Sequence, residues 1–138
     1  GYHAVSQYRR ADYICMADNE FRLEARDRHR DIREIVKEIS RKMHCPNIVV
    51  TGGSRGCLAY GAKEGFFQVP AFAVKVVDRM GAGDAFLSIT APCVMQKAPM
   101  EVVAFIGNVV GSEAVATVGH RSSVEKIPLL KHIEALLK

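Results

Sequence analysis

The sequence lacks several patterns that would assign it to common protein classes. No apolar run approaches the roughly 20 residues that a helix needs to span a bilayer, and residues 1–6 contain no apolar core of a signal peptide. The four cysteines form no Cys-x-x-Cys pair, which argues against a zinc site or a disulfide framework. No Gly-x-Gly-x-x-Gly segment is present, which disfavours a dinucleotide enzyme. We therefore expect a cytoplasmic protein with reduced cysteines and no membrane partner.

The composition is that of one ordinary globular domain. The chain has 138 residues, of which 49% are hydrophobic and 25% are charged, enough to build a core over residues 1–138 as a single domain. The net charge is +4, but acidic residues are interspersed with the basic ones, so we expect no nucleic-acid partner. The chain begins without Met, which suggests a fragment or a processed form.

Apolar patterns predict alternating strands and helices. The expected strands, short apolar runs bounded by Gly, Pro or polar residues, cover residues 12–16, 47–51, 57–60 and 66–70. The expected helices cover residues 24–44, 85–96, about 98–116 and 127–138. In the first of these, Ile32, Ile35, Val36, Ile39 and Met43 repeat with helical spacing.

The most informative stretch is the loop before the second expected helix. A short apolar run ends at Asp78, two glycines follow one residue apart at Gly81 and Gly83, and Asp84 opens the helix. Backbone amides at a helix start lack partners and favour an anion, and glycine lets the backbone approach a ligand closely. A carboxylate beside such amides can accept a proton. This combination suits phosphoryl transfer to a hydroxyl group.

Residues 78–84, Asp-Arg-Met-Gly-Ala-Gly-Asp, resemble the Asp-Thr-x-Gly-Ala-Gly-Asp motif of the ribokinase-like (PfkB) family of sugar kinases. The resemblance implies an α/β fold, a Rossmann-like three-layer sheet with flanking helices, and ATP-dependent phosphorylation of a sugar hydroxyl with Mg²⁺. It implies that Asp84 is the catalytic base. It further implies that the backbone at Gly81, Ala82 and Gly83 stabilises the transferring phosphoryl group.

A second glycine-rich turn lies upstream. Residues 51–57, Thr-Gly-Gly-Ser-Arg-Gly-Cys, resemble the family's Thr-x-Gly-x-x-Gly segment, in which a threonine and glycine amides approach the nucleotide phosphates. The alternative is a simple glycine-rich β-turn between two strands. The resemblance assigns nucleotide binding to four residues: Thr51, Gly53, Ser54 and Gly56.

The helix over residues 98–116 has one flank of small residues. In the family the matching helix borders the adenine, which makes Asn108 and Gly111 candidates for nucleotide binding. Close helix packing through Gly107 and Gly111 is an equal alternative.

Metal sites are expected only by resemblance. The family carries an Asn-x-x-Glu motif tied to magnesium and phosphate, but here Asn19 is followed three positions later by Arg22, so Glu20 or Glu24 would have to substitute. Ordinary helix capping is the alternative reading of Asn19. A monovalent cation, K⁺ in particular, would lie near Asp78 and Ser123 through carbonyl oxygens.

Two features concern the substrate and the extent of the chain. Arg79 stands where the family has a small hydroxyl residue, so it could contact an anionic sugar, as in 2-keto-3-deoxygluconate-type kinases, or be solvated. Residues 107–119 resemble heptose 7-phosphate kinases, in which a nucleotidyltransferase domain often follows. The family's N-terminal sugar-binding and lid segments are not found here, so the chain resembles the C-terminal, nucleotide-binding half. Such a half would expose a sheet edge and pair with the missing half or with another copy. An inactive nucleotide-binding or oligomerisation module remains the alternative to an enzyme.

Overall fold

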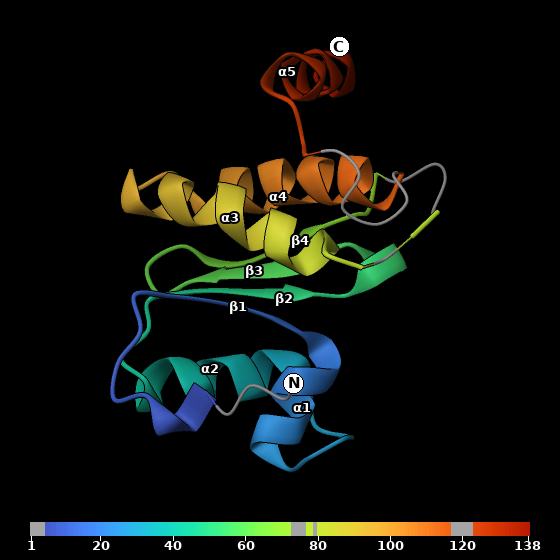
Figure 1. Cartoon of the computed structure of the whole chain (residues 1–138). Coiled ribbons are helices and arrows are strands. Elements are labelled where there is room, and N and C mark those ends of the chain that lie inside the picture. Colours follow the sequence, from blue (N-terminus) through green and yellow to red (C-terminus); the bar gives the residue numbers. More distant parts are fainter. Residues whose placement is uncertain (1–4, 73–76, 79, 117–122) are drawn as a thin grey trace.

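The computed structural model describes residues 5–72, 77–78, 80–116 and 123–138, which form three layers around one sheet (Figure 1). Helices α1 and α2 cover one face of the sheet, α3 and α4 cover the other, and α5 projects beyond α4. The elements in chain order are η1 (Val5–Gln7), β1 (Tyr13–Ala17), α1 (Asp18–Ala25), α2 (Ile32–Lys42), β2 (Asn47–Thr51), η2 (Gly53–Arg55), β3 (Cys57–Gly61), β4 (Gly65–Val69), α3 (Ala82–Met95), α4 (Met100–Val115) and α5 (Lys126–Leu136). The expected α/β class and its layers are confirmed.

The sheet is mixed, with strand order β1-β2-β3-β4. Strands β1 and β2 are parallel, with Tyr13 opposite Asn47 and Ala17 opposite Thr51. A parallel pair needs a long crossover, and α1 and α2 supply it. Strands β2, β3 and β4 form an antiparallel meander. Within the described sheet, β1 and β4 are the edge strands.

Alternation along β2 divides the hydrophobic core in two. Ile48 and Val50 belong to the core that Ile35 of α2 completes. Val49, which lies between them in sequence, belongs to the core that contains Phe86 of α3. Successive side chains of a strand point to opposite faces, so one short apolar strand supports helices on both sides. The sheet is thereby held between two packed layers of helices.

The prediction of a single helix over residues 24–44 was wrong. Arg26 has a φ of 52°, in the left-handed region, and ends α1, while α2 begins only at Ile32. Between them the Asp27 carboxylate accepts two backbone N–H groups, at 3.0 and 3.1 Å, and Asp31 caps α2. Short acidic side chains that bond to nearby backbone compete with helix formation. The charged stretch therefore breaks the helix, and the periodic apolar residues begin only at Ile32, inside α2.

All four cysteines have free thiols, as predicted from their spacing. Cys45 and Cys57 are 1% and 2% exposed. Burial raises the pKa of the Cys45 thiol to about 11 and that of the Cys57 thiol to about 12. These thiols are therefore protonated at neutral pH and serve as small core side chains.

Among the described residues, no helix is both long and apolar enough to cross a membrane. The longest of them, α4, has 16 residues.

Candidate functional site

The loop with two glycines leads into α3 one turn earlier than expected. Gly81 is the N-cap and has a φ of 77°, which favours glycine. The Gly81 carbonyl accepts the N–H of Ala85 at 2.9 Å, so residues 82–84 form the first helical turn. The predicted start at Ala85 was wrong because the glycine that turns the chain is the cap itself, and the small residues after it fit a helix.

The first turn of α3 presents unpaired backbone amides. The N–H groups of residues 82–84 have no carbonyl four residues back within the helix, and no side chain of the described residues caps them. Among the described residues, a Cβ at Gly83 would meet nothing within 4 Å, so the side of the helix at Gly83 is unobstructed. Partial positive charge at a helix start favours an anion.

Asp84 stands on the same turn and is exposed. Within the described part of the chain its carboxylate makes no hydrogen bond or ion pair. A carboxylate that is committed to no structural contact can accept a proton from a ligand. The geometry is therefore compatible with Asp84 as the predicted base. It lies two residues after Ala82, the first residue of α3.

The turn after β2 needs its glycines. Gly56 has a φ of 81°, and a Cβ there would lie 2.0 Å from the Val69 carbonyl oxygen. The backbone N–H of Gly52 donates to the Gly56 carbonyl at 2.7 Å, which closes the turn. Among the described contacts the N–H groups of Gly53 and Ser54 find no acceptor. Two further amides are thus available to an anion, although an ordinary exposed glycine-rich turn would also leave them to solvent.

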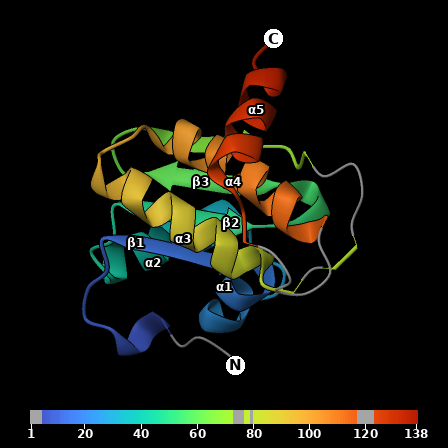
Figure 2. The same ribbon diagram turned by 45° about the horizontal axis from the view of Figure 1, so that its top comes forward.

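These two sets of amides lie at one end of the sheet. Ala17 pairs with Thr51, so α1 and η2 both follow the carboxyl ends of β1 and β2. Figures 1 and 2 show the start of α3 toward that same end. Thr51 itself donates its hydroxyl to the Met16 carbonyl at 3.5 Å. The carboxyl end of a sheet is where open α/β folds bind ligands.

The two candidate nucleotide-binding residues on α4, Asn108 and Gly111, have different surroundings. The Asn108 side-chain amide donates to the Val69 and Pro70 carbonyls, both at 3.0 Å, and so holds the end of β4 against α4. At Gly111 a Cβ would meet nothing within 4 Å, which leaves room for a ligand. The packing alternative applies only to Gly107, where a Cβ would lie 2.2 Å from the Phe86 ring.

The candidate metal-binding residues do not form a cluster in the described part of the structure. Asn19 is exposed on α1, and its neighbour Glu20 accepts the Ala17 N–H at 2.9 Å as a helix cap. Asp78 accepts the backbone N–H of Met80 at 3.0 Å, and Ser123 is exposed. Arg79 lies outside the described residues, as do residues 117–122. In the described part, no cluster of three metal-ligating side chains occurs.

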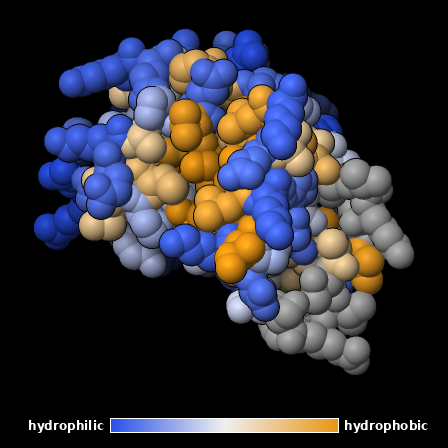
Figure 3. All heavy atoms as spheres, turned by 90° about the horizontal axis from the view of Figure 1, so that it is seen from above, coloured by the Kyte–Doolittle hydropathy of each residue, from blue (hydrophilic) through white to orange (hydrophobic). Residues whose placement is uncertain are grey.

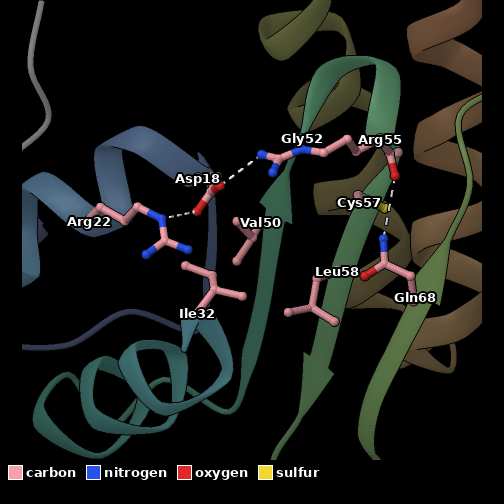
Figure 4. Close-up of a pocket in the computed structure, with 10 residues that line it drawn as sticks. Asp18, Arg22, Ile32, Val50, Gly52, Arg55, Cys57, Leu58 and Gln68 are labelled. Carbon is pink, nitrogen blue, oxygen red and sulfur yellow. Dashed lines mark hydrogen bonds and ion pairs between the residues drawn. The ribbon is translucent and has the colours of Figure 1, made fainter. Parts of the chain in front are cut away.

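Sequence reasoning missed an ion-pair cluster beside the η2 turn (Figure 4). Asp18 accepts from Arg22 at 2.8 Å with one carboxylate oxygen and from Arg55 at 2.8 Å with the other. A pocket lies beside these side chains, with Val50 and Leu58 in its wall. The i, i+4 spacing of Asp18 and Arg22 was visible in the sequence, but Arg55 is 37 residues from Asp18.

Comparison with known proteins decides the family. The model of the pfkB family of carbohydrate kinases matches residues 3–127. The chain belongs to this family. A curated relative, inositol 3-kinase of Arabidopsis thaliana, is 34% identical over 82 residues, which are 59% of this chain and 23% of that protein.

Solved structures of the family share the fold. Phosphofructokinase-2 of Escherichia coli, solved with substrates and products, superposes with a TM-score of 0.83 at 21% identity, over 98% of this chain and 44% of that one. Arabidopsis thaliana ribokinase, solved with ribose and ATP, gives 0.78 at 21% identity, over 89% and 41%. A ribokinase-type protein of Escherichia coli solved with ATP and Mg²⁺ gives 0.78 at 21% identity, over 91% and 40%. The ribokinase-like fold predicted from the sequence is confirmed, and the chain spans less than half the length of these relatives.

Proposed function

We propose that this protein takes part in the transfer of the γ-phosphoryl group of ATP to a hydroxyl group of a sugar or polyol. One observation carries the proposal. The unpaired amides of residues 82–84 and the uncommitted carboxylate of Asp84 share one helical turn, in a chain of the pfkB carbohydrate kinase family. An exposed helix start leaves these groups accessible to solvent and therefore to a ligand.

The chemistry follows from these groups. The acceptor hydroxyl loses its proton to an oxygen of Asp84, and its oxygen forms a bond to the γ-phosphorus of ATP. The bond from that phosphorus to the bridging oxygen breaks, and ADP leaves with the electron pair. The backbone N–H groups of Ala82 and Gly83 at the start of α3, together with that of the N-cap Gly81, would donate to the oxygens on which charge develops. Proton transfer to a placed carboxylate contributes about 10²–10⁴-fold to the rate, and one lost amide donor costs roughly 3–4 kcal/mol of barrier.

The nucleotide would lie between the two glycine-rich segments. The free amides of Gly53 and Ser54 suit the phosphates that precede the transferred group. Gly56 shapes the turn, Thr51 ends the strand that leads into it, and the open space at Gly111 would receive the base. Asn108 acts through β4, whose last carbonyl groups it holds.

Mg²⁺ is the expected metal, since a relative of the same fold was solved with ATP and Mg²⁺. Bound to the phosphates, this ion neutralises their charge, and it keeps much of its water. Asn19 at the start of α1 could contact it through water. A monovalent cation such as K⁺ beside Asp78 and Ser123 is part of the proposal.

For the substrate that accepts the phosphoryl group, we propose a chemical class and not one compound. The relative inositol 3-kinase favours a polyol or sugar, while heptose 7-phosphate and 2-keto-3-deoxygluconate are the anionic candidates that the sequence suggested. Arg79 distinguishes them: its replacement by alanine should reduce the preference for anionic sugars if it contacts their charge.

A partner surface is also expected. Large apolar residues are exposed on α3, α4 and α5, among them Leu87, Met95, Val102, Ile127 and Leu130, and Figure 3 shows apolar side chains gathered on the face seen from the α5 side. We propose that this face and the β1 edge meet the remainder of a two-part kinase or another copy, in the cytoplasm.

The test is a titration followed by an assay. Calorimetry of the 138-residue chain with ATP and Mg²⁺ should show binding at one site per chain, and the native protein should phosphorylate at least one member of a panel containing inositol, ribose, heptose 7-phosphate and 2-keto-3-deoxygluconate. Binding without any turnover by the native protein would favour the alternative, an inactive nucleotide-binding module. Absence of ATP binding would refute the proposal.

A further inference from the structure

Backbone hydrogen bonds close the η2 turn, but its side chains contribute little to holding it in place. Three of the five residues at positions 52–56 are glycines, and glycine loses the most conformational freedom when it is ordered. Ser54 is exposed and makes no side-chain contact within the described residues. Arg55 is therefore the residue through which a side chain can fix this turn, and two of its groups are engaged.

The contacts of Arg55 join the turn to two other elements (Figure 4). Its guanidinium donates to the Asp18 carboxylate at 2.8 Å, at the first residue of α1. Its carbonyl accepts from the Gln68 side chain at 3.4 Å, on β4. The Asp18 contact is the shorter and is charge-assisted, so it is the stronger restraint.

Asp18 is itself firmly placed. Its side chain is only 19% exposed, and its other carboxylate oxygen accepts from Arg22 Nε at 2.8 Å. Arg22 also donates to the carbonyls of Arg28 and Arg30, both at 2.9 Å. A side chain with three acceptors has little freedom, so Arg22 fixes Asp18 and Asp18 can fix Arg55.

We propose that Asp18 is a positioning residue of the phosphate-binding turn, acting through Arg55 to aim the free amides of Gly53 and Ser54. This inference rests on the proposed nucleotide site. Arg55 is 71% exposed, so the pair adds little to global stability. Its effect falls on the local geometry of the turn, and hence on the affinity for ATP.

A double-substitution cycle tests this. In the native protein, Asp18→Asn and Arg55→Gln should each raise KM for ATP by about 3–10-fold, and the double variant should be no worse than the poorer single variant, because contacting residues couple. The kcat at saturating ATP, the KM for the sugar and the melting temperature should change little. Arg55→Lys should restore part of the ATP affinity.

The Arg30–Glu38 pair, also at 2.8 Å, provides the matched control. Glu38→Gln removes a comparable exposed ion pair that lies away from the turn, and should leave KM for ATP unchanged.

Three outcomes would overturn the inference. If Arg55→Gln raises KM for ATP while Asp18→Asn does not, Arg55 contacts the phosphates directly and Asp18 positions nothing. If the two effects multiply in the double variant, the residues act independently. If the wild-type protein binds no ATP, the proposed function fails as well, whereas an active wild type with uncoupled substitutions refutes this inference alone.

Discussion

The ring of Phe86 lies directly against the backbone of Gly107. A Cβ at position 107 would be 2.2 Å from the ring's Cζ, so α3 and α4 approach closely here only because the residue is glycine. Phe86 follows Asp84 by two residues on α3. This contact therefore sets the position of the helix that carries the candidate catalytic turn.

The first prediction concerns this contact. Gly107→Ala should lower the free energy of unfolding by about 1–3 kcal/mol, because an added methyl group forces the Phe86 ring to move. Urea unfolding of the chain measures it. The matched control is Gly111→Ala on the same helix, where a Cβ meets nothing and the change should be neutral or stabilising by up to about 1 kcal/mol. Equal losses at both positions would contradict the packing assignment.

A second prediction compares two glycines of the phosphate-binding turn. Both have positive φ, 59° at Gly53 and 81° at Gly56, but only Gly56 also faces a backbone carbonyl, that of Val69. Gly53→Ala should lower the free energy of unfolding by about 1–2 kcal/mol, the usual penalty for a residue with a Cβ in the left-handed conformation. Gly56→Ala should cost clearly more, because the chain of β4 must shift. The account would be wrong here if Gly56→Ala were the milder variant in urea unfolding.

The third prediction is a loss of stability at alkaline pH. Burial raises the pKa of the Cys45 thiol from its ordinary value of 9.0 to about 11. Between these pH values the unfolded chain releases a proton that the folded chain retains, so folding stability is full below about pH 9 and falls as pH rises toward 11. Urea unfolding at several pH values from 7 to 10.5 should show this decline. Cys45→Ala should reduce the slope, and identical slopes in both proteins would count against it.

The strands and helices that make up the layers were largely predictable, because apolar runs and turn residues mark them over short stretches of sequence. The strand 47–51 has a continuous apolar run at residues 48–50 and is bounded by Pro46 and Gly52, a pattern that indicates a buried strand. The break between α1 and α2 was not predictable from periodicity, since residues 26–31 contain no apolar side chain whose spacing could be read. It depends on Asp27, whose bonds to the loop backbone become apparent only in three dimensions.

In the candidate site, too, some features were visible in the sequence and others depend on contacts between distant residues. Asp84 and the glycines before it are contiguous, so their pattern was visible in the sequence. The bridge from Asp18 to Arg55 and the bonds from Asn108 to the end of β4 join residues 37 to 39 positions apart. No short-range pattern encodes such contacts, and for that reason the bonds from Asn108 to β4 were not foreseen and Asp18 was not considered.

A fourth prediction separates stability from activity at Gly83. The residue lies in the first turn of α3 and a Cβ there meets nothing, so Gly83→Ala should raise the free energy of unfolding by about 0.5–1 kcal/mol. The same methyl group would stand where the phosphoryl group must approach the amides. A displacement of ~1 Å can cost up to about 100-fold in rate, so kcat/KM of the native protein should fall. An unchanged kcat/KM would place the phosphates elsewhere.

The central claim is that the Asp84 carboxylate accepts the proton of the acceptor hydroxyl, and Asp84→Asn tests it most directly. The control is Glu101→Gln, an exposed acid in the first turn of the neighbouring α4. With the phosphorylated sugar identified from the panel, kcat of Asp84→Asn should fall by about 10²–10⁴-fold. Its calorimetric affinity for ATP with Mg²⁺ should stay within about threefold, because the helix amides remain, and Glu101→Gln should match the wild type in both quantities. A kcat for Asp84→Asn within a few-fold of the wild type would contradict the account.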